Sequence, residues 1–216
     1  MLAALLPLVL ARQATAPLAL ALGPAAVGTR EYRLVLRAEF ASSPAETESV
    51  TIRETTEAKG AGFGRVRTVL KGSPAEDLPQ FRVGTREEGE IDARGAQIGK
   101  GPWLIPLPDV VLPVKPISVG GEWESELPPR ILDVIPFRCR LVGKETIAGR
   151  EALRLRLFWP KSPKGIVLEE AFTLLDARDL LPLQTLIRAR VTRLDAGTRV
   201  RFRLCREGVP GLTLPE

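Results

Sequence analysis

The sequence predicts a mainly β fold: a single curved antiparallel sheet of the half-barrel type, with a Pro-rich strap and little helix. Apolar and polar residues alternate with a period of two over Tyr32–Phe40, which is typical of a strand with one buried face and one solvated face. No long segment with a period of 3.6 residues stands out. The 19 glycines and 19 prolines suit many short turns.

The same alternation recurs along the chain, and the polar partner is very often arginine. One wet face per strand favours an antiparallel sheet over a parallel sheet that is covered on both sides. We expect about nine or ten strands between residues 31 and 205. The clearest strand signals are Glu31–Phe40, Ser49–Glu57, Gly64–Lys71, Phe137–Glu145, Glu151–Trp159, Ile166–Leu175, Leu183–Leu194 and Thr198–Cys205.

Residues 101–118 interrupt this pattern with five prolines among Leu, Ile and Val. Proline lacks the backbone N–H that a sheet ladder or a helix interior needs, so the segment is neither a central strand nor a long helix. Because it is apolar, we expect it to lie over one opening of the core as a strap.

The chain divides into a leader at 1–27, an antiparallel β domain at 28–205 and a C-terminal tail at 206–216. Leu2–Ala11 is an apolar run followed by small residues, which resembles a secretory signal peptide and predicts a secreted or periplasmic protein. The run is too short for a transmembrane span. It lacks a basic start, so a disordered tail on a cytoplasmic protein is the alternative.

Histidine is absent, which removes the commonest general base near neutral pH and the commonest metal ligand. With two cysteines, a structural zinc site within one chain is not expected either. We therefore expect no enzyme, no catalytic residue, no metal and no cofactor. Cys139 lies on the inward phase of its strand and Cys205 on the outward phase near a strand end. The pair forms a disulfide or, alternatively, Cys139 is a small buried hydrophobe.

Three segments of the second half resemble a set of uncharacterised secreted bacterial families, which are similar to the lipoprotein-carrier (LolA-like) half-barrel. The first is the step from Pro113 to Trp123, with Val119-Gly120-Gly121 before the tryptophan. The second is the strand-turn-strand from Leu141 to Ala152. The third is a corner from Phe172 to Leu183, where Asp179 replaces the usual glycine. The resemblance covers roughly residues 105–205 and implies a curved sheet around an apolar cavity, with no catalytic residues to transfer.

Two sets of residues are candidate sites. The inward apolar residues are expected to line a cavity for a lipid or another hydrophobic small molecule; the alternative is a filled core. These residues are Tyr32, Leu34, Leu36, Phe40, Phe81, Trp103, Trp123, Phe137, Leu155, Leu157, Phe172 and Phe202.

The second set is a ladder of arginines on the wet face, which could meet an anionic envelope component. A plain solvated face, or neutralisation by Glu169 or Glu170, explains the ladder equally well. Nucleic acid is not expected, because no exposed aromatics are interleaved with the basic residues. The arginines are Arg188, Arg190, Arg199, Arg201 and Arg203.

These observations favour a non-enzymatic binding protein for an apolar or lipid-like ligand or an envelope component. The alternative is a structural or interaction domain with a filled core, acting through the arginine-rich convex face. Acidic runs such as Glu87–Asp92 show no calcium-loop spacing and are expected to be solvated.

Overall fold

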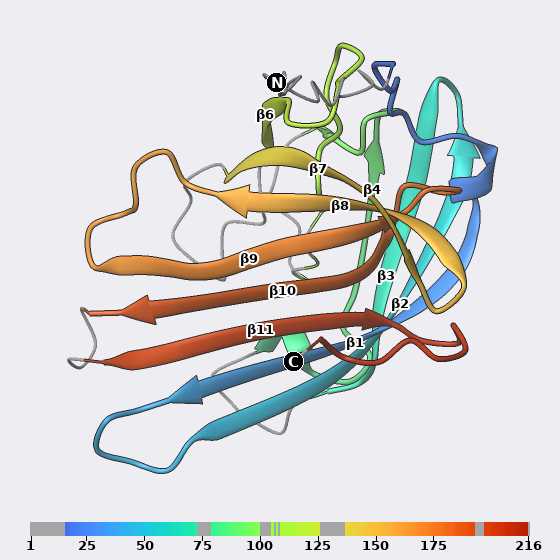
Figure 1. The fold of residues 1–216 in the computed structure, drawn as a ribbon. Helices are drawn as coiled ribbons and strands as arrows, with labels where there is room; N and C mark the ends of the chain where they lie inside the picture. The colour runs from blue at the N-terminus through green and yellow to red at the C-terminus, as the bar shows by residue number, and fades with distance from the viewer. Residues whose placement is uncertain are drawn as a thin grey trace, which may run out of the picture.

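The fold is an open antiparallel sheet of 11 strands, seen in a computed structural model that describes residues 16–72, 79–99, 105, 107, 109–125, 137–192 and 197–215. The sheet is curved into a half-barrel, and two short 3-10 turns, Pro24–Ala26 and Pro79–Phe81, are the helical elements of the described residues (Figure 1). The fold class predicted from the alternation is confirmed. The strands are β1 Gly28–Glu39, β2 Glu46–Lys59, β3 Gly62–Lys71, β4 Arg86–Ile91, β5 Gln97–Ile98, β6 Glu122–Ser125, β7 Phe137–Ile147, β8 Arg150–Phe158, β9 Ile166–Asp176, β10 Pro182–Val191 and β11 Thr198–Arg206.

The chain forms two meanders that meet in the middle of the sheet. The strand order is β5-β4-β3-β2-β1-β11-β10-β9-β8-β7-β6, so the first and last strands of the chain are neighbours. The first meander ends at one edge of the sheet and the second begins at the opposite edge. The strap is therefore the connection that crosses from edge to edge.

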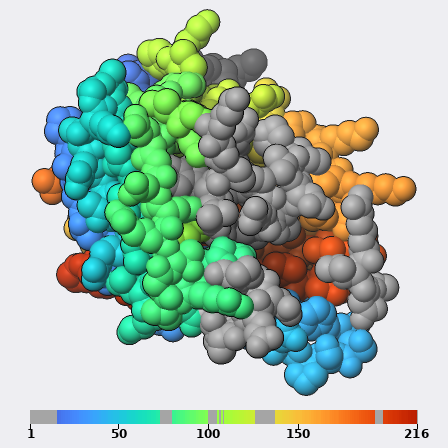
Figure 2. Space-filling view, turned by 180° about the vertical axis from the view of Figure 1, so that it is seen from behind, coloured from blue at the N-terminus to red at the C-terminus, as the bar shows by residue number. Residues whose placement is uncertain are grey.

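The strap lies against the inner face of the sheet and bonds to both edges. Leu112 donates its N–H to the Arg94 carbonyl beside β5, and Val111 donates to Ser125 Oγ on β6. Ile105, Leu107, Leu112 and Ile117 are buried in the main core. From the opposite side, the green residues of β4, β5 and the strap lie between the blue and the orange strands (Figure 2). The expectation of an apolar strap over the core agrees with these contacts.

The N-terminal segment before β1 is part of the packed domain. Leu18 pairs with Ile117 of the strap, and Leu20, Leu22 and Ala26 are buried in the main core. The expected boundary at Gly28 is therefore too late, because apolar residues between positions 18 and 26 complete the core. The apolar run that predicts a signal peptide lies outside the described residues.

The C-terminal tail packs on the outer face of the sheet, the face turned away from the main core. Val209 is buried there with Ala152, Leu174 and Leu183 in a second, smaller cluster. Gln184 donates its side-chain N–H to the Thr213 carbonyl, which holds the tail along β10.

Candidate functional site

A seam opens in the sheet where β8 and β9 stop pairing. Their ladder runs from Ala152 opposite Asp176 to Arg156 opposite Phe172, and the rest of β9, from Ile166 to Ala171, has no partner on β8. The flanking pairs continue: β7 holds β8 as far as Phe158, and β10 holds β9 as far as Ile166. The two strands therefore diverge like the arms of a V (Figure 1).

Local sequence explains the divergence. Glu169 is an extra residue in β9, because Arg188 of β10 faces Glu170 while the next residue, Ala189, faces Leu168. Such a bulge bends its strand and increases its twist. Pro160 and Pro163 in the connection remove backbone donors that a longer β8–β9 ladder would need.

The seam contains a hollow of about 1340 Å³. Its floor is apolar: Leu141, Leu157 and Trp159 belong to the main core, and Leu168 packs against it. Three arginines line the hollow as well, Arg140, Arg154 and Arg156. The remaining lining residues are Ser118, Val119, Gly120, Val142, Phe158, Ser162, Glu169, Glu170, Ala171 and Phe172.

The arginines at the mouth differ in how they are held. Arg140 is ion-paired with Glu122 and lies over the Phe158 ring at 5.5 Å. Arg154 lies 3.3 Å from Glu145 and over the Phe172 ring at 4.4 Å. Arg156 is exposed, and no carboxylate of the described chain lies within ion-pair distance of it. The mouth therefore offers a guanidinium with free donors above an apolar floor.

Most of the predicted cavity residues lie in the main core cluster. Described residues of the strap and of the N-terminal segment pack in the same cluster. Tyr32, Leu34, Phe81, Trp123, Phe137, Leu155, Leu157 and Phe202 are all buried in the main cluster, and Leu36 packs against it.

The other three predicted cavity residues lie elsewhere. Phe40 is half-buried just after β1, and Trp103 lies outside the described residues. Phe172 is on the outer face with Arg154 and Leu174, so its predicted inward direction is wrong. The bulge at Glu169 is the reason, because one extra residue reverses the inside–outside phase of the rest of the strand. Of the predicted residues that the structure describes, Leu157 and Phe172 line the seam.

Sequence reasoning missed Arg156, Trp159 and Leu168 as site residues. Arg156 was one of many outward arginines, and Leu168 alternated like any core residue. The Trp159-Pro160 step at a strand end is the one local signal, since proline there predicts that the ladder stops.

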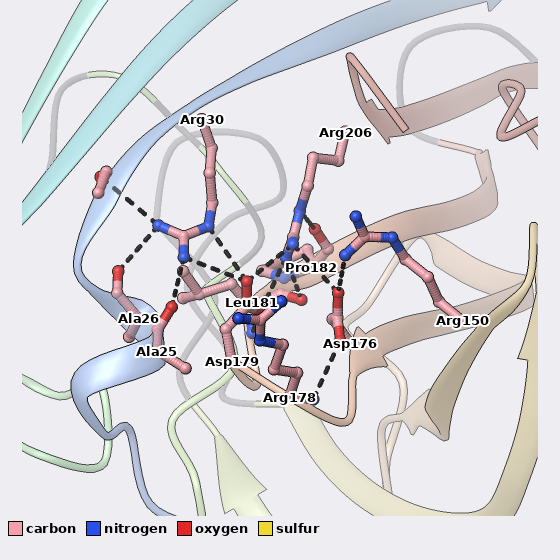
Figure 3. Close-up of polar contacts among 11 residues, drawn as sticks. Ala25, Ala26, Arg30, Arg150, Asp176, Arg178, Asp179, Leu181, Pro182 and Arg206 are labelled. Carbon is pink, nitrogen blue, oxygen red and sulfur yellow. Dashed lines mark hydrogen bonds and ion pairs between the residues drawn. The ribbon is translucent and has the colours of Figure 1, made fainter. Parts of the chain in front are cut away.

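A second polar cluster, at the start of β1 and the end of β11, is structural (Figure 3). Arg206 donates to Asp179 at 2.8 and 3.0 Å and to the carbonyls of Pro182 and Leu181. Arg30 donates to Asp179 and to the carbonyls of Ala25 and Ala26. The donors are used within the protein, so the cluster ties β1 and β11 to the β9–β10 turn and leaves little for a ligand.

A third cluster ties the strap to the sheet. Arg67 is fully buried and donates to Glu54 at 2.9 Å and to Asp109 of the strap at 2.6 and 2.5 Å. Arg65 also donates to Asp109 at 2.9 Å. Burial would raise the pKa of Asp109, but the two guanidinium groups outweigh it and hold that pKa below its ordinary value. Among the described residues, no three His, Cys, Asp or Glu side chains are grouped to hold a metal ion.

The predicted arginine ladder lies on the outer face as expected, with Arg188 opposite Arg201 and Arg190 opposite Arg199. Glu170 lies 3.1 Å from Arg188, and Glu169 lies 3.9 Å from Arg199. The two glutamates therefore neutralise part of the ladder. Cys139 and Cys205 are both buried and unpaired, on opposite faces of the sheet.

No protein-family model and no curated protein matches the chain. Several solved structures are similar to it. An outer membrane lipoprotein-sorting protein domain from Vibrio parahaemolyticus is 12% identical, with a TM-score of 0.27, over 84% of this chain and 86% of that one. A LolA superfamily protein from Nitrosomonas europaea is 9% identical, with a TM-score of 0.25, over 82% and 84%.

A chain of the Pseudomonas aeruginosa MucA/MucB complex is 14% identical, with a TM-score of 0.31, over 86% of this chain and 54% of that one. The chain therefore spans about half the length of that protein. No function follows from a likeness at this level. No helix of the described residues is long and apolar enough to cross a membrane.

Proposed function

We propose that this chain is a non-enzymatic binding protein, secreted or periplasmic, for an amphiphile with an apolar chain and an anionic head. The ligand lies in the β8–β9 seam. One observation carries the proposal: the seam combines an apolar floor with an unpaired guanidinium at its mouth. The apolar run Leu2–Ala11 supports the location.

The hollow has the size and the chemistry for such a ligand. Pockets that bind small molecules are usually about 300–1,000 Å³ and mostly apolar, with a few polar groups that fix orientation. The hollow in the seam exceeds that range, at about 1340 Å³, which leaves room for a long acyl chain. Leu157, Trp159 and Leu168 contact the apolar chain of the ligand. Arg156 binds the carboxylate or phosphate head of the ligand through charge-assisted hydrogen bonds.

The seam replaces the concave face as the ligand site. Leu34, Leu155 and Phe202, which were expected to line a cavity on that face, are buried in the main core, whereas the seam is hollow. Binding at the seam needs no displacement of the strap.

A fluorescent fatty acid and its uncharged methyl ester test the proposal. We expect the folded protein to bind the acid. Leu168→Trp places a large ring in the hollow and should abolish binding, whereas Leu168→Met conserves volume and should retain it. Arg156→Gln should weaken binding of the acid about tenfold or more and leave the ester unchanged, because a hydrogen bond to a charged group contributes about 1.5–3 kcal/mol.

Arg190→Gln is the matched control, since Arg190 is also exposed on the outer face and does not line the hollow. Two results would overturn the proposal. One is a well-folded protein that binds neither probe. The other is full binding by Leu168→Trp.

A further inference from the structure

The outer face of β1, β11 and β10 carries a two-dimensional array of arginines. Across the three strands, Arg37 lies opposite Arg201, which lies opposite Arg188. Arg203 occupies the neighbouring row and Arg33 the row beyond it. We call this set the arginine surface; its residues are Arg33, Arg37, Arg188, Arg190, Arg199, Arg201 and Arg203.

The few carboxylates lie at the margins of the arginine surface. Glu39 pairs with Arg37 at the end of β1, and Glu169 and Glu170 reach it from β9. In the described ranges, no carboxylate lies within 4 Å of Arg33, Arg201 or Arg203. The middle of the array is therefore an uncompensated positive field.

Arg203 shows the electrostatic cost of this arrangement. Its pKa is lowered by partial burial and by the nearby positive charges of Arg201, Arg37, Arg188 and Arg33. Like charges on facing positions of neighbouring strands destabilise a sheet. A planar array of anions against the surface would remove this repulsion.

Packing over apolar neighbours explains why long side chains stand on this face, but it does not explain why all of them are positively charged. Val35 and Leu186, which flank Arg203 on the outer face, are buried, as expected if arginine stems cover them. Long side chains of mixed charge would cover apolar residues equally well. Glu31 and Arg53, on the same side of β1 and β2, form such a pair at 2.8 Å. Seven arginines of one sign therefore point to an anionic partner.

We propose that the arginine surface docks on a membrane of anionic phospholipids. The three strands β1, β11 and β10 are adjacent in the curved sheet (Figure 1). The registers place the arginines on the outer face of all three, so they present a surface rather than a groove that would follow a linear polymer. Clusters of four to eight basic residues are typical of anionic-lipid binding, and the planar guanidinium suits phosphate. Phe172 and Arg156, at the seam, lie on the same face, so docking would turn the seam toward the lipid. That last point rests on the proposed function; the membrane contact does not.

Sedimentation with vesicles of phosphatidylcholine, alone or mixed with phosphatidylglycerol, tests this proposal. We expect binding to the anionic vesicles at about 0.1 M salt, weaker binding at higher salt, and no binding to the neutral ones. The triple change Arg33→Gln, Arg201→Gln and Arg203→Gln should reduce the partition coefficient on the order of 100-fold, since each arginine near such a surface contributes roughly fivefold.

The matched control is Lys71→Gln, Arg86→Gln and Lys115→Gln, which removes the same charge from exposed positions elsewhere. We expect it to bind almost like the unmodified protein. If the arginine triple does not fold, the single change Arg33→Glu at an exposed position makes the same test. Leu168→Trp should bind vesicles normally, which separates this proposal from ligand binding in the seam.

Three results would overturn the proposal. Equal losses in the two triples would mean that net charge alone drives binding. Equal binding to neutral vesicles would remove the role of charge. Arginine-dependent binding to soluble polyphosphate without vesicle binding would identify a linear polyanion as the partner instead.

Discussion

At the scale of single residues, a buried arginine holds the strap. Arg67 is the largest fully buried side chain of the described residues, and its charge is compensated by Glu54 and Asp109. Arg67→Met would leave both carboxylates buried without their main partner. We expect a loss of about 3–5 kcal/mol in the free energy of unfolding, measured by urea denaturation, because removing one partner of a buried ion pair is strongly destabilising. Arg53→Gln, which breaks the exposed pair with Glu31, should cost less than about 1 kcal/mol. Similar losses in the two variants would contradict the structural role of Arg67.

Single residues also show where sequence-based prediction ends. The inward directions of Tyr32, Leu34 and Phe202 follow from alternation, because their strands pair without interruption in β1 and β11. Phe172 breaks the rule because one bulge residue reverses the phase, and no local signal distinguishes Glu169 as that residue. The buried Arg67 alternates with Val66 and Thr68, and the pattern alone does not reveal that carboxylates of two other segments surround it.

At the scale of elements, attachment of the strap depends on pH. The pKa of Asp109 is lowered in the folded protein: burial opposes this, but Arg67 and Arg65 outweigh burial. A carboxyl with a lowered folded pKa contributes stability above its unfolded pKa, near 4, and loses it as the pH falls through the folded value. Asp109→Asn should therefore reduce stability most at pH 7, and its difference from the unmodified protein should shrink below about pH 4. Urea denaturation at several pH values measures this, with Glu88→Gln on an exposed side chain as the control. A difference that stays constant down to the lowest pH would contradict the mechanism.

Most strands can be predicted from the sequence, whereas the way in which they pair and pack against one another cannot. The strands of the second meander and their turns were predictable, because alternation and glycine are local signals. The short edge strands β5 and β6 are two and four residues long, too short for a period to emerge. The seam results from pairing that stops midway between β8 and β9, which depends on a bulge and on two prolines acting together. The burial of Leu20 and Leu22 depends on contacts far along the chain: Leu22 donates its N–H to the Ala93 carbonyl, and Leu18 pairs with Ile117.

At the scale of the whole molecule, the two cysteines report on the two faces of one sheet. Cys139 lies in the main core opposite Leu157, and Cys205 lies on the outer face opposite Arg33. Thiols on opposite faces cannot form a disulfide without backbone movement, so the protein should keep both thiols even in an oxidising compartment. Burial raises the pKa of Cys139 to about 12 and, together with Glu207, that of Cys205 to about 11. Both thiols are therefore protonated and unreactive in the folded protein.

Thiol labelling at pH 8 tests this arrangement in the Cys139→Ser and Cys205→Ser variants, each of which keeps one thiol. We expect the thiol of Cys139 to react only through global unfolding, so that its labelling rate falls as the stability of the protein rises. The thiol of Cys205 lies near the end of β11 under surface side chains, and we expect it to react faster, through local opening, with little dependence on denaturant. Intact-mass analysis of the unmodified protein after air oxidation should show both thiol hydrogens retained. A disulfide between the two cysteines, or faster labelling of Cys139 than of Cys205, would show that the two residues do not lie on opposite faces of one intact sheet.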